Sequence, residues 1–153
     1  MEYARQVLGI SDAQHAEYGD THAPLVVTPL SCSLAGQTLE VVVQPDSRTG
    51  QIYQQRRVRE QYHCNFGLNG AYQVLLHEGG LRVVGVDAEG EARIVELPAL
   101  RFFVGTLFLP QHLSTVARPH PLIVAYVAAA AEFRGSRAPA TLPSHGAAAY
   151  PPR

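Results

Sequence analysis

The sequence predicts a fold of the α/β class, and the main signal for it comes from residues 102–133. Residues 102–108 form a nearly continuous apolar run rich in β-forming residues, which is typical of a strand buried on both faces. Residues 122–133 are apolar, rich in Ala and free of Gly and Pro, which favours a helix. Pro110 ends the strand, and open α/β sheets place their chemistry just outside the carboxyl end of such a strand. We therefore expect any site to lie near residues 109–112.

Earlier stretches of the chain supply further elements of both kinds. Residues 2–8 are predicted to form a helix, and residues 70–78 an amphipathic helix with Tyr72, Leu75 and Leu76 facing inward. The other expected segments are strands at 25–28, 39–43 and 62–67, a candidate short strand at 51–53, a loop or single helical turn at 56–60, and a β-hairpin of 81–86 and 92–97 around a turn at 87–90.

Length and composition bound the class of protein. The 153 residues suit one domain, which we expect over residues 1–134, followed by a disordered tail rich in Pro and Ala at 135–153. The net charge of −1 gives no electrostatic footprint for nucleic acid, and no apolar run reaches the length of a membrane span. Cys32 and Cys64 lie far apart without C-x-x-C spacing, so we expect reduced thiols in a cytoplasmic protein. No compact set of ligands predicts a metal or cofactor.

Two stretches near opposite ends of the chain resemble one family. Residues 2–10 read Glu-Tyr-Ala-Arg-Gln-Val-Leu-Gly-Ile, and residues 108–111 read Phe-Leu-Pro-Gln before the Ala-Arg-Pro-His-Pro-Leu of 117–122. Both resemble the glutaminase domain of CTP synthase, a class I glutamine amidotransferase, and the resemblance covers about residues 2–133. It implies a three-layer αβα, flavodoxin-like fold, of which this chain holds the C-terminal portion.

The resemblance also implies that the catalytic pair has been replaced. At the end of the strand the family has Phe-His-Pro-Glu, in which the His takes a proton from a Cys nucleophile and the Glu orients the His. Leu109 and Gln111 stand at those two positions, and neither can carry out that proton transfer. The family's nucleophile turn, Gly-x-Cys-x-Gly, is expected just before the helix at Glu2. We therefore expect no catalytic residue in this chain, and a glutaminase-like domain that is inactive by itself and binds a small ligand or a partner.

The chain is more similar still to a set of bacterial proteins related to the C-terminal region of CTP synthase. Those proteins share Tyr-x-Cys-Asn-x-Gly, seen here at residues 62–67, and Phe-x-Pro-Gln, seen at 108–111. Some members carry selenocysteine near the nucleophile position. We therefore expect that Met1 is not the true start and that an in-frame UGA codon precedes it.

This resemblance leaves an alternative function and a partner open. The alternative is a fragment of a longer enzyme of pyrimidine nucleotide metabolism, of the CTP synthase or glutamine amidotransferase type, or a selenocysteine or cysteine redox enzyme. Because the resemblance implies missing strands, a second copy or a partner chain is expected to cover the edge of the sheet.

A few polar residues are candidates for binding. Asn65, Gln111 and His112 could contact a small glutamine-like molecule at the strand end, although satisfied loop residues would look the same in the sequence. Cys64 and Cys32 are candidate reactive thiols, and a plain structural Cys is the favoured alternative for each. His63 and Cys64 are neighbours on a predicted strand and should point to opposite faces, which disfavours a dyad. His120 lies between two prolines and is expected on the surface.

Overall fold

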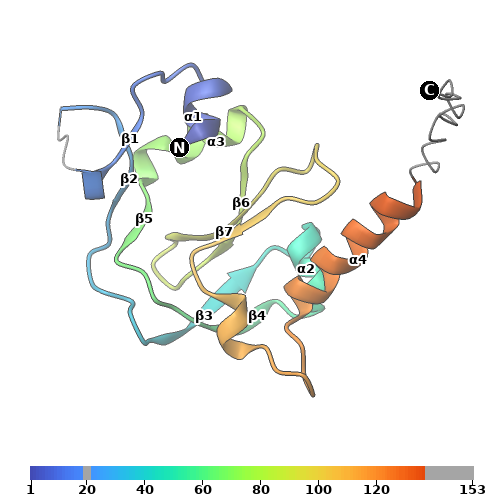
Figure 1. Ribbon diagram of the computed structural model, residues 1–153. Coiled ribbons are helices and arrows are strands. Elements are labelled where there is room, and N and C mark those ends of the chain that lie inside the picture. The colour runs from blue at the N-terminus through green and yellow to red at the C-terminus, as the bar shows by residue number, and fades with distance from the viewer. Residues whose placement is uncertain (19–21, 137–153) are drawn as a thin grey trace, which may run out of the picture.

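The computed structural model describes residues 1–18 and 22–136 (Figure 1). In chain order the elements are α1 (Glu2–Gln6), β1 (Gln14–His15), η1 (Ala16–Tyr18), β2 (Leu25–Pro29), β3 (Thr38–Val43), α2 (Arg48–Tyr53), β4 (Arg57–Gln61), β5 (Phe66–Leu68), η2 (Gly70–Tyr72), α3 (Gln73–Glu78), β6 (Arg82–Val86), β7 (Ala92–Glu96), β8 (Val104–Thr106), η3 (Pro110–Leu113) and α4 (Pro121–Ser136), where η marks a 3₁₀-helix.

The larger sheet has five strands in the order β4-β3-β6-β7-β8, and all neighbouring pairs in it are antiparallel. It curls, so its two outer strands meet at one end. Tyr62, just after β4, forms an isolated antiparallel bridge with Phe108, just after β8. Beside it the Leu109 N–H donates to the Gln61 carbonyl at 3.1 Å. A smaller sheet has the order β1-β2-β5, in which β1 runs parallel and β5 antiparallel to β2.

The main hydrophobic core lies between the larger sheet and helices α2 and α4. Figure 1 shows α2 and α4 together beside the strands, and α1 and α3 next to each other at the top of the view, away from α2 and α4. The buried members of this core are Leu34, Val41, Val43, Val58, Tyr62, Val84, Ile94, Phe108 and Leu122, with Ile52 and Tyr53 of α2 packed against them. A second cluster of Ala4, Ala13 and Val26 joins α1 to the smaller sheet.

The segment around α2 differs from the prediction, because local capping decides its conformation. Residues 51–53, predicted as a short strand, form the last turn of α2. Ser47 caps this helix, since its hydroxyl accepts a hydrogen bond from the Gly50 N–H at 2.9 Å. Gln54 then ends the helix in the left-handed conformation, with φ at 54°. Gly50 suits its position because an added Cβ would stand 2.2 Å from the Gln44 carbonyl oxygen.

The prediction of a loop or a helical turn at residues 56–60 is also wrong, because most of this segment is β4, an outer strand of the larger sheet. Val58 and Glu60 are buried while Arg57 and Arg59 are exposed, which is the alternation of a strand with one buried face. A carboxylate at one of the inward positions hides that alternation in the sequence. Its burial depends on a partner that only the fold supplies.

The strand predicted at residues 102–108 is shorter and less buried than expected. Only β8 belongs to the sheet, all of its residues are half-buried, and Phe103 is 40% exposed. The strand predicted at 62–67 is similarly reduced to the bridge at Tyr62 and to β5. Between them the carbonyls of Cys64 and Asn65 accept hydrogen bonds from a loop, at 3.1 Å and 2.9 Å, so the extended chain pairs there without a regular ladder.

Other predicted elements are confirmed. Strands β6 and β7 form the expected hairpin, and α4 covers the helix expected at 122–133. The helix expected at 70–78 is divided into η2 and α3, where Leu76 is buried but Leu75 is 39% exposed rather than inward.

The domain boundary expected after residue 134 lies within α4, which continues to Ser136, and residues 137–153 of the expected tail lie outside the described residues. Among the described residues, no helix combines the length and apolarity needed to cross a bilayer.

Phe108 should be a major contributor to stability. Its side chain is 1% exposed and packs edge-to-face on Tyr62, with ring centroids 5.9 Å apart, where the outer strands meet. We expect Phe108→Ala to lower the free energy of unfolding by about 3–5 kcal/mol, because the large cavity left cannot collapse fully. Phe103→Ala is the matched control and should cost less than half as much. Equal losses in urea unfolding of the two variants would contradict this description of the core.

Candidate functional site

The end of β8 leads into the expected site at residues 109–112. Leu109 is half-buried and precedes η3, which Pro110 opens. The Leu109 carbonyl accepts a hydrogen bond from the His112 N–H at 2.9 Å, which fixes the turn after the strand. Since the Leu109 N–H donates to the Gln61 carbonyl, the turn is held beside the end of β4.

A cavity of about 450 Å³ lies next to this strand end, and we name it the Asn65 cavity. Its walls combine polar and apolar side chains, namely His15, Glu17, His63, Cys64 and Asn65 on the one hand and Val27, Phe66, Leu68 and Leu107 on the other, with Gly67 between them. The half-buried Cys64 thiol donates to the Leu107 carbonyl at 3.0 Å, so it is held against the wall. A site with these walls can take a small molecule that has both polar groups and a hydrocarbon chain.

Asn65 is the residue of this cavity best placed to contact a ligand. It is exposed, and its side-chain oxygen accepts a hydrogen bond from the Ser33 hydroxyl at 2.6 Å. This hydrogen bond engages the oxygen end of the amide and so fixes the orientation of the side chain. In the part of the chain that the structure describes, its Nδ2 atom has no partner, so its donors remain available.

Sequence reasoning missed the other polar wall of the cavity. His15 packs on Phe66, with ring centroids 4.8 Å apart, and its Nδ1 atom accepts a hydrogen bond from the Glu17 N–H at 3.1 Å. The sequence of residues 11–18 is typical of a surface loop. Its mixture of a His and an acidic residue was a weak signal, and only the pairing of β1 with β2 brings it to the cavity.

The remaining predicted residues lie outside the cavity wall. Gln111 is exposed, and its carbonyl accepts from the Ser114 N–H at 3.3 Å. His112 is exposed too, with its ring centroid 6.3 Å from that of His63. Cys32 is exposed and does not line the cavity. The structure therefore brings Cys64 and Asn65 to one cavity and places His112 beside its His63 wall.

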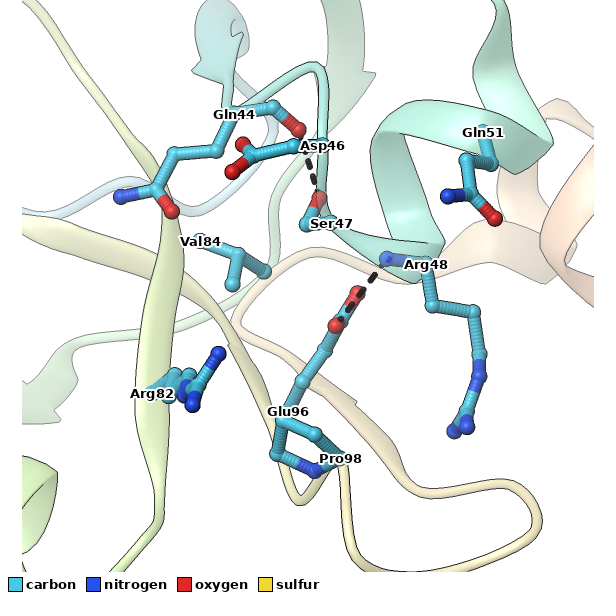
Figure 2. Close-up of a pocket in the computed structure, with 9 residues that line it drawn as sticks. All are labelled: Gln44, Asp46, Ser47, Arg48, Gln51, Arg82, Val84, Glu96 and Pro98. Carbon is cyan, nitrogen blue, oxygen red and sulfur yellow. Dashed lines mark hydrogen bonds between the residues drawn. The ribbon is translucent and has the colours of Figure 1, made fainter.

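A second cavity, of about 230 Å³, lies at the start of α2 (Figure 2). Its most buried polar member is Glu96, whose carboxylate accepts hydrogen bonds from the N–H groups of Thr49 at 2.6 Å and Arg48 at 3.3 Å. The Thr49 hydroxyl donates to the same carboxylate. These bonds satisfy Glu96 within the protein, so its role is to anchor α2 on β7. In the described residues no group of three or more His, Cys, Asp or Glu side chains is placed to hold a metal ion.

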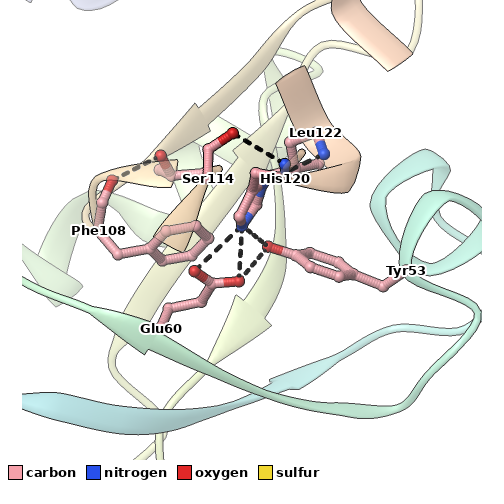
Figure 3. A network of polar contacts seen from close by, with 7 residues as sticks. Tyr53, Glu60, Phe108, Ser114, His120 and Leu122 are labelled. Atoms are coloured by element: carbon pink, nitrogen blue, oxygen red, sulfur yellow. Dashed lines mark hydrogen bonds and ion pairs between the residues drawn. The ribbon is translucent and has the colours of Figure 1, made fainter. Parts of the chain in front are cut away.

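The prediction that His120 lies on the surface is wrong. His120 is 4% exposed, and its Nε2 atom lies 3.0 Å from Oε1 of Glu60, which is 2% exposed (Figure 3). The Tyr53 hydroxyl donates to the same carboxylate at 2.6 Å. The His120 N–H donates to the Ser114 hydroxyl at 3.0 Å, which helps to hold this residue at the start of α4.

Hydrogen bonding assigns the tautomer of His120. Its Nδ1 atom accepts from the Leu122 N–H at 3.3 Å, so the ring proton is on Nε2 and faces the Glu60 carboxylate. Both ring nitrogens are thereby engaged, which leaves no atom free to act as a general base. The network therefore joins β4, α2 and the start of α4, and its role is structural.

Burial also affects two phenols close to this network. Removal from water raises the pKa of Tyr53 far above its ordinary value, and the hydrogen bond to Glu60 raises it further. Burial likewise raises the pKa of Tyr62. Both hydroxyls therefore stay protonated at neutral pH, and Tyr53 remains a hydrogen-bond donor to Glu60.

The chain is similar in sequence and in structure to CTP synthases. The CTP synthase of Bacteroides fragilis is 31% identical over 140 residues, covering 85% of this chain and 26% of the relative. The CTP synthase of Mycobacterium tuberculosis is 34% identical over 160 residues, covering 94% of this chain and 27% of the relative. The solved glutaminase domain of Trypanosoma brucei CTPS with bound acivicin matches at a TM-score of 0.78 and 29% identity, covering 86% of this chain and 55% of that one. This chain is a class I glutamine amidotransferase-like domain related to CTP synthase.

The CTP synthase relationship confirms the predicted α/β fold of the three-layer, flavodoxin-like type. A putative GMP synthase subunit from Thermoplasma acidophilum, at 11% identity and a TM-score of 0.53, shares the fold alone. No family model matches the chain. The chain spans 26% of the length of the Bacteroides CTP synthase, so the activity of that whole protein does not follow from the match.

The Glu60–His120 pair gives this CTP synthase-related domain a testable dependence on one buried contact. We expect His120→Ala to lower the free energy of unfolding by about 1–3 kcal/mol, because the buried Glu60 carboxylate would lose one of its two hydrogen-bond donors and keep only the Tyr53 hydroxyl. His112→Ala, at an exposed His, should change it by less than about 0.5 kcal/mol. Chemical denaturation of both variants measures this, and a His120→Ala loss as small as that of the control would contradict the structural role of the pair.

Proposed function

We propose that this chain is a CTP synthase-related glutaminase-like domain that binds a small glutamine-like molecule in the Asn65 cavity without hydrolysing it. The observation that carries the proposal is the presence of Leu109 and Gln111 at the strand end where the resembled family has its His and Glu. The cavity beside that strand end supplies the binding part of the proposal.

The loss of hydrolysis follows from the chemistry of two side chains. The aliphatic group of Leu109 cannot accept a proton from a nucleophile, and the neutral amide of Gln111 cannot stabilise an imidazolium. Gln111 is also exposed and lies outside the cavity wall. The two substitutions remove base and orienting group together, as expected for a domain that has lost the reaction and kept the scaffold.

The Asn65 cavity supports a ligand with the polarity of an amino acid amide. The Glu17 carboxylate suits an ammonium group, and the free Nδ2 donors of Asn65 suit a carbonyl or carboxylate oxygen. Leu68 and Leu107 provide an apolar wall for the methylene chain between such groups. A glutamine-like molecule carries these three features, which is why we prefer it to a purely apolar ligand.

The rival function is that of a fragment of a longer enzyme in pyrimidine nucleotide metabolism. The observation in its favour is that the chain spans about a quarter of the length of the CTP synthases it matches. In that case the Cys64 thiol in the cavity wall, or a nucleophile in another segment, would take part in thiol chemistry. The two functions differ in whether this chain alone turns over a substrate.

Ammonia release separates the two proposals. We expect the purified chain to release no ammonia from L-glutamine above a heat-denatured sample, measured with a coupled glutamate dehydrogenase assay. The variant Leu109→His with Gln111→Glu should also stay inactive, because a base and its orienting group do not supply a nucleophile. Release of ammonia by the unmodified chain, at a rate proportional to protein concentration, would refute the proposal that the domain binds its ligand without hydrolysing it.

Binding is tested separately by titrating the chain with L-glutamine and following backbone amide shifts by NMR. We expect the shifts to cluster at residues 63–67, and Asn65→Ala and Glu17→Ala each to weaken the affinity by at least about fivefold through loss of a polar contact. Cys32→Ser, outside the cavity, is the control and should leave the affinity unchanged. Shifts centred elsewhere, or none at saturating glutamine, would rule out this ligand in this cavity.

A further inference from the structure

The outer edge of β4 presents backbone groups that the sheet does not use. The Val43 N–H donates to the Arg56 carbonyl at 2.8 Å, and the Tyr62 N–H donates to the Gln37 carbonyl at 2.9 Å, which fixes the hydrogen-bonding register of β3 and β4. Because pairs alternate in an antiparallel ladder, the N–H and C=O groups of Arg57 and Arg59 point away from β3. In the part of the chain that the structure describes, no strand pairs with them on that side.

The backbone of the same edge already accepts a hydrogen bond two residues further along β4. There the Gln61 carbonyl accepts the Leu109 N–H at 3.1 Å, so the chain after β8 already begins to pair with it. The pairing stops because the chain turns into η3 at Pro110. The positions at 57 and 59 are thus the open continuation of an edge that is geometrically competent for strand pairing.

A cavity of about 330 Å³ runs along this open edge. Its wall includes Val58, Leu113 and Pro119, which can cover one apolar side chain, and its rim includes Arg57, Arg59 and Arg118. It lies apart from the Asn65 cavity and shares no residue with it.

The net charge of this rim is positive, because three arginines face the single exposed carboxylate of Glu40. Arg57 is ion-paired with Glu40, and one Arg59 nitrogen lies 3.4 Å from the Thr38 carbonyl. The Arg118 guanidinium has no hydrogen-bond or ion-pair partner among the described residues. The acidic member of the wall, Glu60, has its carboxylate bonded to Tyr53 and His120 and only 3% of its side chain exposed, so it offsets little of that charge.

We propose that the outer edge of β4 binds an extended acidic peptide segment of another protein by strand addition. The backbone of the peptide pairs with Arg57 and Arg59, and its acidic side chains at alternate positions reach the guanidiniums of those residues, which share one face of the strand. Arg118 binds a further carboxylate, and one apolar side chain of the peptide enters the cavity. A second copy of this chain is a poor occupant, because pairing β4 with β4 would bring like-charged arginines together.

The test is binding of a fluorescein-labelled eight-residue peptide that alternates Glu with Val, followed by fluorescence anisotropy with the full chain. We expect saturable binding that weakens as salt is raised, because charged contacts are screened. Arg118→Glu and Arg59→Glu should each weaken binding at least about tenfold, while Arg82→Glu, an exposed Arg on β6, should leave it within about twofold. A peptide with Lys in place of Glu should not bind.

Backbone pairing is tested with a peptide of the same sequence that is N-methylated at every second residue. We expect its loss of binding, since methylation removes the N–H groups that strand addition needs. Equal binding of the methylated peptide, or full competition by inorganic tripolyphosphate with no dependence on the backbone, would show an anion site and overturn the proposal. Absence of peptide binding at low salt, or a dimer in sedimentation that Arg59→Glu dissociates, would overturn it as well.

Discussion

The buried contact between Glu60 and His120 holds together elements that are far apart in the sequence. The carboxylate comes from β4, the imidazole from the start of α4 and the phenol that also binds the carboxylate from α2. Each group would be costly to bury alone, because a polar or charged group removed from water must find a partner. Together they satisfy one another, and the sheet can then close against the two helices over its apolar core.

The strand that carries this contact, β4, also leads to the two surfaces that we propose bind a small ligand and a peptide. The contact ties β4 to α2 and α4, and the segment that follows β4 meets the end of β8 at the bridge of Tyr62 with Phe108. From that junction the chain reaches Cys64 and Asn65 in one direction, where the Asn65 cavity opens. In the other direction it leaves the backbone of Arg57 and Arg59 on an open edge. The Asn65 cavity and the open edge of β4 therefore adjoin the same junction.

The strand end shows how a backbone turn can be held independently of the side chains that it carries. A turn held by backbone hydrogen bonds, such as that from Leu109 to His112, tolerates a change of side chain because the side chain takes no part in the turn. The fold of the CTP synthase glutaminase domain is kept at 29% identity to a solved relative. Backbone atoms of this stretch determine the fold, and side-chain atoms would determine any reaction. Similarity of fold therefore does not imply similarity of reaction.

By itself the sequence determined the α/β class, the hairpin of β6 and β7, helix α4 and the strand end that leads to the candidate site. These features rest on local periodicity, on turn residues and on family motifs, all of which can be read from neighbouring positions. It also pointed to Asn65 and Cys64 as residues of interest. Only the tertiary structure decided that His120 and Glu60 are buried in contact with each other, and that His15 and Glu17 line the cavity. Their partners lie up to sixty residues away, as in the Glu60–His120 bond, and a sequence pattern does not reveal which distant group will satisfy a polar side chain once water is removed.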